Sequence, residues 1–258
     1  MNFKRVQEDG LAWLAWSLED VFPELSYRSW TRCGGVSLPP YDGLNLSYGV
    51  GDDPDRVSQN RRLVRLSMVL DELISVGQVH GSNTLILSAK EKPQPVREVH
   101  GIDILITDIP GLGLLIKQAD CQAVALYDPE NQVIANIHCG WRGNVHDVIG
   151  QAVGHLRAGF GTRPENLRAA LSPSLGPCCA EFINYRKEFP EKFWPYQVRP
   201  HFFDLWRLSC DQLQQAGVRP GNIHVAGWCS RCQEKDLFSY RRAQVTGRNG
   251  TVIALRRP

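Results

Sequence analysis

Residues 118–143 read QADCQAVALYDPENQVIANIHCGWRG, and this stretch decides how the chain around it folds. Two short apolar runs, Gln122–Tyr127 and Gln132–His138, flank a turn-forming Asp-Pro-Glu-Asn segment. This pattern predicts a β-hairpin. Because the start of one antiparallel strand lies beside the end of the other, we expect Cys121 and His138 to be neighbours in space.

A thiol beside an imidazole has two chemical interpretations. The pair is either a cysteine nucleophile with its base or two ligands of a soft metal ion. The sequence of the hairpin alone leaves both interpretations open.

Composition places the chain among ordinary globular proteins. It has 258 residues, of which 43% are hydrophobic and 22% charged, and its net charge is only +2. That charge does not indicate nucleic acid or a membrane as a partner, and no run of eighteen apolar residues predicts a membrane span. Glu8, Asp9, Glu19 and Asp20 interrupt any signal-peptide core, so we expect a cytoplasmic protein.

Eight cysteines are many for a chain of this kind. A reducing cytoplasm disfavours a disulfide framework, which leaves metal binding or catalysis as the better explanation. Cys229 and Cys232 have the spacing of half a zinc site, but no second Cys-x-x-Cys or matching histidine pair follows. Adjacent Cys178 and Cys179 cannot easily chelate one ion together, so we expect them to be structural.

Sequence patterns predict helices, strands and one long loop in the rest of the chain. The predicted helices are 3–20 (weakly), 54–66 after the capping Asp53, 145–156 and 204–216. The predicted strands are 73–79, which delivers His80, and 84–87, 103–107, 113–118 and 167–172. The glycine-rich segment 31–54 predicts a long ordered loop, and 91–101 a polar loop with a solvated His100.

These elements predict one α+β domain over residues 1–258, with 1–20 as a possible N-terminal extension. The chain has no internal repeat and no obvious linker. Its strands do not alternate strictly with helices, as they would in a doubly wound sheet. We therefore expect sheets in a central layer with helices outside.

Several motifs, in this order, resemble those of the YfiH family, also called laccase-domain or polyphenol oxidase proteins. The motifs span roughly Trp30 to Arg248. They are GGVS…LNLSYGVGDDP…NRR, QVHG (78–81), ADC (119–121), HCGWRG (138–143) and FSYRR…TGR.

The resemblance implies a central β-sandwich of mixed sheets flanked by helices, similar to the catalytic domain of cytotoxic necrotizing factor. It implies an active site of His80, Cys121 and His138 that can bind zinc, with copper as the alternative. It also implies a substrate contact at Asn45. The chain has Cys139 where the family usually has alanine, which is expected to put one more thiol near the site. It also has alanine at position 123, where proline is usual, and we expect that change to matter little.

The resemblance brings three activities. The first is phosphorolysis of adenosine and inosine (and possibly methylthioadenosine) with deamination of adenosine, and the others are polyphenol oxidation and editing of cell-wall precursors. None of the seven histidines are two residues apart, so the chain lacks the His-x-His pairs of a multicopper cluster. Met1 and Met68 are the only methionines, and they offer no obvious blue-copper arrangement.

Zinc chemistry fits the residues better. A set of two histidines and one cysteine with an open position is typical of catalytic zinc, which lowers the pKa of bound water. Asp103 or Asp120 could carry protons as the carboxylate of zinc deaminases does. Since neighbours in a strand point to opposite faces, Asp120 can do so only if the backbone bends there.

Phosphorolysis needs an anion site. Arg142, in the loop that joins the second hairpin strand to a helix, is the expected phosphate contact. Arg241, Arg242 and Arg248 form a second basic group, for which phosphate binding competes with a solvated surface. The leading hypothesis is a purine nucleoside phosphorylase that is a monomer or weak homodimer, with nucleoside and phosphate as its partners.

Overall fold

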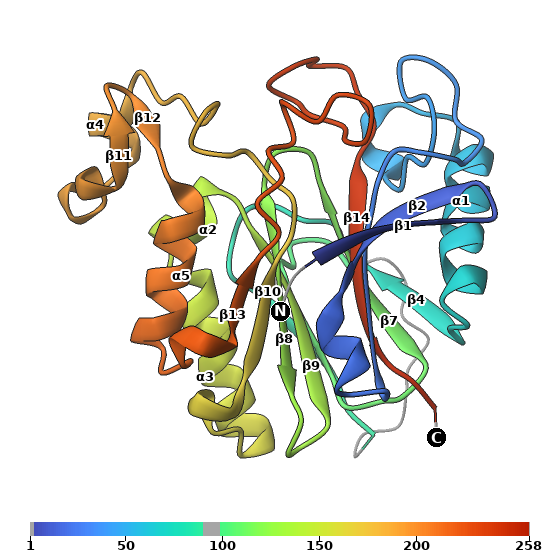
Figure 1. Cartoon of the computed structure of the whole chain (residues 1–258), viewed down its shortest axis with the longest axis horizontal. Helices are drawn as coiled ribbons and strands as arrows, with labels where there is room; N and C mark the ends of the chain where they lie inside the picture. Colours follow the sequence, from blue (N-terminus) through green and yellow to red (C-terminus); the bar gives the residue numbers. More distant parts are fainter. Residues whose placement is uncertain (1–2, 90–98, 258) are drawn as a thin grey trace.

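The computed structural model describes residues 3–89 and 99–257. Two six-stranded sheets form the centre of the molecule, and helices lie on their outer sides (Figure 1). The first sheet has the order β1 (Phe3–Glu8), β2 (Leu11–Trp16), β3 (Leu25–Trp30), β14 (Asn249–Leu255), β7 (Leu112–Gln118) and β4 (Glu72–Ser75). The second has the order β13 (Ile223–Val225), β10 (Arg168–Leu171), β8 (Gln122–Asp128), β9 (Val133–Cys139), β6 (Ile104–Thr107) and β5 (Thr84–Leu87).

Helices and short elements complete the described part of the chain. The α-helices are α1 (Pro54–Ser67), α2 (Trp141–Val145), α3 (Val148–Phe160), α4 (Tyr185–Glu188) and α5 (Leu205–Gln215). Strands β11 (Gln197–Arg199) and β12 (Phe202–Phe203) form a separate small ribbon. Most of the polar loop predicted at 91–101 lies outside the described residues.

Both large sheets are mixed. Strand β4 pairs with β7 in parallel, as do β5 with β6 and β10 with β13. The remaining neighbours in the two sheets are antiparallel. The predicted α+β fold, with mixed sheets in the centre and helices outside, is confirmed.

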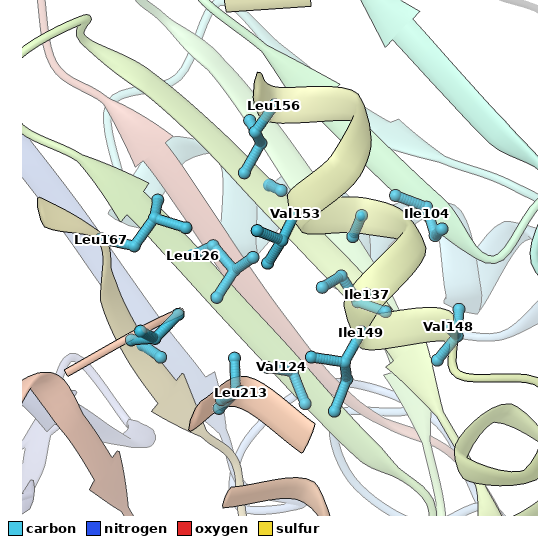
Figure 2. Packing of buried hydrophobic residues seen from close by; sticks show 14 of the residues in the cluster. Ile104, Val124, Leu126, Ile137, Val148, Ile149, Val153, Leu156, Leu167 and Leu213 are labelled. Carbon is cyan, nitrogen blue, oxygen red and sulfur yellow. The ribbon is translucent and has the colours of Figure 1, made fainter. Parts of the chain in front are cut away.

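Three apolar layers hold the sheets and helices together. Residues from both sheets, including Trp16, Tyr27, Ile116 and Tyr127, fill the layer between them. Helix α1 covers the outer face of the first sheet, where Val64 packs. Helix α3 covers the outer face of the second sheet, and Figure 2 shows its apolar side lying against β8 and β9. Because each sheet is covered on both faces, β8 and β9 are buried along their whole length.

The predicted hairpin is confirmed as β8 and β9. Its register pairs Ala123 with His138. In the turn, Asp128 Oδ1 accepts hydrogen bonds from the backbone N–H groups of Glu130 at 2.9 Å and Asn131 at 3.3 Å. This Asx turn fixes the register that brings the reactive ends of the two strands together.

Helix α1 begins as predicted, with Asp53 accepting a hydrogen bond from the N–H of Asp55 at 2.9 Å. The helix predicted at 145–156 instead begins at Val148. Asp147 adopts a left-handed conformation, with φ of 52°, and caps α3. His146 and Asp147 separate α3 from the short α2, which starts four residues before the predicted helix.

The weak helix predicted at 3–20 was wrong, because residues 3–16 form the β1–β2 hairpin and only Ser17–Asp20 form a short 3₁₀ helix. An Asp9-Gly10 turn with positive φ at both residues joins the strands, and this dipeptide is a strong hairpin signal. The spacing of Trp13 and Trp16 mimicked a helix because β2 is buried on both faces. Trp13 packs in the apolar layer on the outer face of the first sheet, and Trp16 packs in the layer between the two sheets.

Within residues 3–89 and 99–257, none of the helices has the length and apolar character needed to cross a membrane.

Candidate active site

His80, Cys121 and His138 converge on one point. Their ligand atoms all lie within 4.8 Å of one another. The distance from Cys121 Sγ to His80 Nε2 is 3.8 Å, and the two imidazole centroids are 4.8 Å apart. Cys121 precedes β8, His138 lies near the end of β9, and His80 follows β4 of the other sheet. The expected proximity of Cys121 and His138 is therefore confirmed, and His80 joins them.

Asp103, immediately before β6, holds both histidines in place. Its fully buried carboxylate lies 2.7 Å from His138 Nδ1. It also accepts hydrogen bonds from the backbone N–H groups of Val79, His80 and Gly81, at 3.2, 3.0 and 2.7 Å. These bonds stabilise the left-handed conformation of His80, whose φ is 63°. One carboxylate thus orients one ring directly and the other through its backbone.

Burial opposes ionisation of the Asp103 carboxyl, but the hydrogen bonds from His138 and the backbone outweigh it and hold the pKa of Asp103 below its ordinary value. Burial likewise opposes ionisation of Cys121, but His138 and His80 lower the pKa of its thiol to about 6. For His138, the negative Cys121 and Asp103 outweigh burial and raise the imidazole pKa to about 9. The metal-free cluster is therefore a thiolate–imidazolium pair near neutral pH.

The backbone does bend at Asp120, where φ is 89°. However, three donors engage the Asp120 carboxylate at 2.6 Å: Ser230 Oγ, Ser239 Oγ and the backbone N–H of Arg241. Asp120 thereby anchors the C-terminal loops beside the cluster. Of the two candidate proton carriers, Asp103 is the one that contacts a histidine.

Cys139, expected to put one more thiol near the site, is buried close enough to Cys121 for that group to influence its ionisation. Alternation along β9 turns its side chain away from that of His138. Cys139 is only 1% exposed and packs in the apolar layer with Val148 and Ile149 of α3. Burial there raises the pKa of Cys139 strongly, so it stays an inert thiol.

Gly140 lets the chain pass close to the cluster. A Cβ atom at this position would lie 2.8 Å from Cys121 Sγ and 3.2 Å from His80 Cδ2. A Cβ atom here would therefore displace the side chain of Cys121 and press on that of His80.

The cluster lies in the wall of a cavity of about 790 Å³. This volume is within the range of small-molecule sites. Three arginines are among its lining residues, Arg142, Arg241 and Arg248. The side chain of Arg142 is exposed and lies over the Trp141 ring at 4.5 Å. The cavity therefore combines the Cys–His cluster with groups that attract an anion.

Asn45 and Arg242 lie behind the cavity wall rather than among its lining residues. Asn45 is fully buried, and its Oδ1 accepts a hydrogen bond from the N–H of Arg248 at 2.9 Å. Arg242 donates to the carbonyl oxygens of Ser230 and Leu237. Asn45 thereby holds the backbone of Arg248, and the Arg242 guanidinium holds the loop segments at Ser230 and Leu237.

Sequence reasoning did not single out the aromatic lining of the cavity, which includes Tyr48, Phe182 and Tyr240. Tyr48 and Tyr240 belong to the LNLSYG and FSYRR motifs, which were the available signal. His100 was expected to be solvated, and it is exposed. It also lines the cavity, and a β-bridge joins its backbone to that of Gly77.

The residues present fit a metal ion. Zinc–sulfur and zinc–nitrogen bonds of about 2.3 and 2.0–2.1 Å require tetrahedral ligands to be about 3.6 Å apart, and the sulfur–nitrogen distance is 3.8 Å. His80, Cys121 and His138, which all line the cavity, would supply three ligands. The Asp103–His138 contact is the support that metal-binding histidines usually have.

Known proteins resemble this chain over most of its length. Residues 27–256 match the family described as multi-copper polyphenol oxidoreductase laccase. The purine nucleoside phosphorylase of Deinococcus radiodurans is 37% identical, with 88% of each chain covered. Purine nucleoside phosphorylase YfiH of Escherichia coli is 32% identical, with 87% of this chain and 91% of the relative covered.

Solved structures show the same fold. The crystal structure of YlmD from Geobacillus stearothermophilus superposes with a TM-score of 0.87 at 28% identity, and it covers 98% of this chain and 99% of its own. With the family match spanning residues 27–256 and relatives above 30% identity, the chain belongs to the multi-copper polyphenol oxidoreductase laccase family of enzymes, which includes the YfiH proteins.

Proposed function

We propose that this protein is a purine nucleoside phosphorylase that cleaves adenosine and inosine with phosphate and also deaminates adenosine. One observation carries the proposal: the Cys–His cluster and three arginines line the same cavity. Phosphorolysis needs both an anion site and a proton donor, and the family relatives named above carry this activity in their names.

The arginines would bind phosphate. Arg142 is exposed at the start of α2, and Arg241 and Arg248 enter the cavity from the C-terminal loops. Guanidinium groups suit phosphate because they form paired, charge-assisted hydrogen bonds. A phosphate oxygen would form a bond to C1′ of the ribose while the bond from C1′ to the purine nitrogen breaks.

His138 would protonate the departing purine. The raised pKa of His138 keeps its ring protonated near neutral pH, and the contact of Nδ1 with Asp103 fixes the ring's orientation. General acid catalysis of this kind contributes about 10²–10⁴-fold. The rings of Tyr48, Phe182 and Tyr240 offer flat apolar surfaces against which the purine can stack.

Deamination of adenosine would use the same residues. A zinc ion held by His80, Cys121 and His138 would supply an activated water when bound. The chain's own contribution is to hold the purine with C6 towards the cluster, while Asp103 fixes the orientation of the His138 ring through Nδ1. Ammonia and inosine are the products, and inosine is itself a substrate for phosphorolysis.

Incubation of purified protein with inosine, with and without phosphate, tests the proposal. We expect hypoxanthine and ribose 1-phosphate only when phosphate is present, and ammonia from adenosine. Cys121→Ala should lower the rate of phosphorolysis by about 10²–10⁴-fold and abolish deamination. Cys33→Ala is the matched control because Cys33 does not line the cavity. If neither inosine, adenosine nor methylthioadenosine is consumed by zinc-loaded or metal-free protein, the proposal is refuted.

Polyphenol oxidation is the second candidate, because two histidines and a cysteine are also a copper-binding set and the family is described by that activity. Copper-loaded and zinc-loaded protein should be compared on a phenol and on inosine. Phenol turnover by the copper form, together with absent nucleoside turnover by both forms, would favour oxidation. A screen of cell-wall precursors in the same assay tests the editing activity of the family.

A further inference from the structure

Four cysteine sulfurs form a second cluster outside the cavity. Cys178 and Cys179 follow β10, and Cys229 and Cys232 follow β13. Their Sγ atoms all lie within 4.8 Å of one another. The sequence favoured a structural role for Cys178 and Cys179, because adjacent cysteines cannot easily chelate one ion together, and it did not connect them with Cys229 and Cys232; the fold brings all four sulfurs together.

The sulfur–sulfur distances match those of a tetrahedral metal site. Cys232 Sγ lies 3.7 Å from Cys178 Sγ and 3.5 Å from Cys179 Sγ. Zinc–sulfur bonds of about 2.3 Å place tetrahedral sulfurs about 3.8 Å apart. A disulfide needs about 2.05 Å, and all four cysteines are free.

We propose that these four cysteines bind one zinc ion in a structural site that is distinct from the active-site cluster. Four thiolate ligands complete the tetrahedron and leave no open position, which is the pattern of a structural site. Binding would release the thiol protons to solvent and involves no change of oxidation state. The inference does not depend on which reaction the active site performs.

The surroundings of the cluster resemble those of a bound thiolate. The backbone N–H of Gly176 donates to Cys229 Sγ at 3.3 Å. The N–H groups of Cys232 and Gln233 both donate to the carbonyl oxygen of Cys229, at 3.1 and 3.0 Å, which closes a tight turn between the last two cysteines. Arg199 donates to the carbonyl oxygen of Cys178 at 3.0 Å and brings positive charge next to an anionic centre.

The ion would join two loops that build the cavity wall. Leu175 and Phe182, on either side of the first cysteine pair, line the cavity. Ser230, within the second pair, donates to the Asp120 carboxylate beside the active-site thiol. We therefore expect loss of zinc to loosen this wall as well as to destabilise the fold.

Metal analysis of a variant that lacks ligands of the active-site Cys–His cluster tests the proposal. In the background His80→Ala/Cys121→Ala, we expect one zinc per chain, with an X-ray absorption spectrum that fits sulfur ligands alone. Adding Cys229→Ser and Cys232→Ser should remove that zinc and lower the Tm by more than about 4 °C. Adding Cys33→Ser and Cys210→Ser instead, at cysteines outside both clusters, should leave the zinc in place.

A measurement on the unmodified chain covers the case in which the double serine variant does not fold. Cobalt substitution should give an intense sulfur-to-cobalt charge-transfer band, and this band should persist in His80→Ala/Cys121→Ala. Three results would each overturn the proposal. The first is that His80→Ala/Cys121→Ala folds without bound metal, and the second is that its X-ray absorption spectrum shows nitrogen ligands. The third is that the four cysteines are recovered as disulfides from protein purified with a reductant.

Discussion

The two clusters use similar donor atoms but rest on different kinds of backbone. His138 lies in a buried strand of the second sheet, and the buried Asp103 orients both histidines. The four cysteines lie outside the strands and helices, and two of them, Cys178 and Cys232, are exposed. The first cluster is therefore preorganised by the sheets, whereas the second depends on its ion to fix the loops.

The difference indicates that the first cluster carries the chemistry and that the second contributes to the stability of the fold. Removing a donor from the first cluster should remove chemistry but leave the fold, because the sheets hold the remaining groups. Removing a donor from the second should loosen the fold and change chemistry only indirectly.

Cys121→Ala should give the largest effect and the clearest separation. We expect phosphorolysis to fall by about 10²–10⁴-fold, with a Tm change of less than about 3 °C. Cys232→Ser should show the reverse, a lower Tm with a rate within about threefold at temperatures where it stays folded. The rates and thermal melts of the two variants are measured side by side. A large Tm loss in Cys121→Ala would break the comparison.

Alkylation of metal-free protein should distinguish the thiols of the two clusters. Neighbouring imidazoles lower the pKa of Cys121 to about 6, whereas burial and neighbouring thiols raise the pKa of Cys179 to about 11. Cys121 is therefore a thiolate above about pH 6. At pH 7 a much larger fraction of Cys121 than of Cys179 is thiolate, but a thiolate of lower pKa is intrinsically less nucleophilic. The net expectation is that Cys121 is labelled on the order of 50-fold faster than Cys179.

Mass spectrometry of iodoacetamide-treated protein between pH 5 and 9 measures both rates, with the pH range chosen around these pKa values. The Cys121 rate should rise through about pH 6 and then level off. An inflection near the ordinary thiol pKa of about 8.5 would contradict the thiolate–imidazolium pair.

Asp103→Asn should weaken the first cluster without emptying it. The amide preserves shape but loses the negative charge that orients His138 and raises the pKa of that ring. Loss of such a carboxylate typically costs about 10–100-fold in metal affinity or activity. Zinc titration and the inosine assay measure both. The control is Asp108→Asn, because the Asp108 carboxylate instead accepts hydrogen bonds from Ser88 Oγ and the backbone N–H of Ala89.

Gly140→Ala should give the smallest effect, about tenfold in rate, because a small displacement of reacting groups is costly. The added methyl group would press on Cys121 and His80. Gly154→Ala is the matched control: no atom lies within 4 Å of its Cβ position in α3, so it should stabilise the helix by about 0.5–1 kcal/mol. Equal kinetics in the two variants would show that the close approach at Gly140 is unimportant.

Local signals were sufficient for the elements that depend on neighbours in sequence. The Asp-Pro-Glu-Asn turn and its flanking apolar runs predicted β8, β9 and the meeting of Cys121 with His138. Asp53-Pro54 predicted the start of α1. Similarity to a known family, rather than any local pattern, added His80 and the arrangement of the sheets.

What could not be predicted depends on contacts between distant segments. The two faces of β2 pack into different apolar layers, which hid its strand character behind a helical spacing. The side chains of Asp120 and Asn45 are engaged by Ser230 and Arg248, far along the chain. The four cysteines meet only because loops after β10 and β13 lie side by side, and no spacing rule covers that arrangement.

The position of β14 has a consequence for how the protein folds. Residues 249–255 pair with β3 on one side and β7 on the other, so the two halves of the first sheet have no direct backbone pairing until this late segment arrives. Pairings over such long sequence separations slow folding and leave strand edges open in the meantime. Newly made chains are therefore expected to reach the native state slowly and to be prone to aggregation before β14 is inserted.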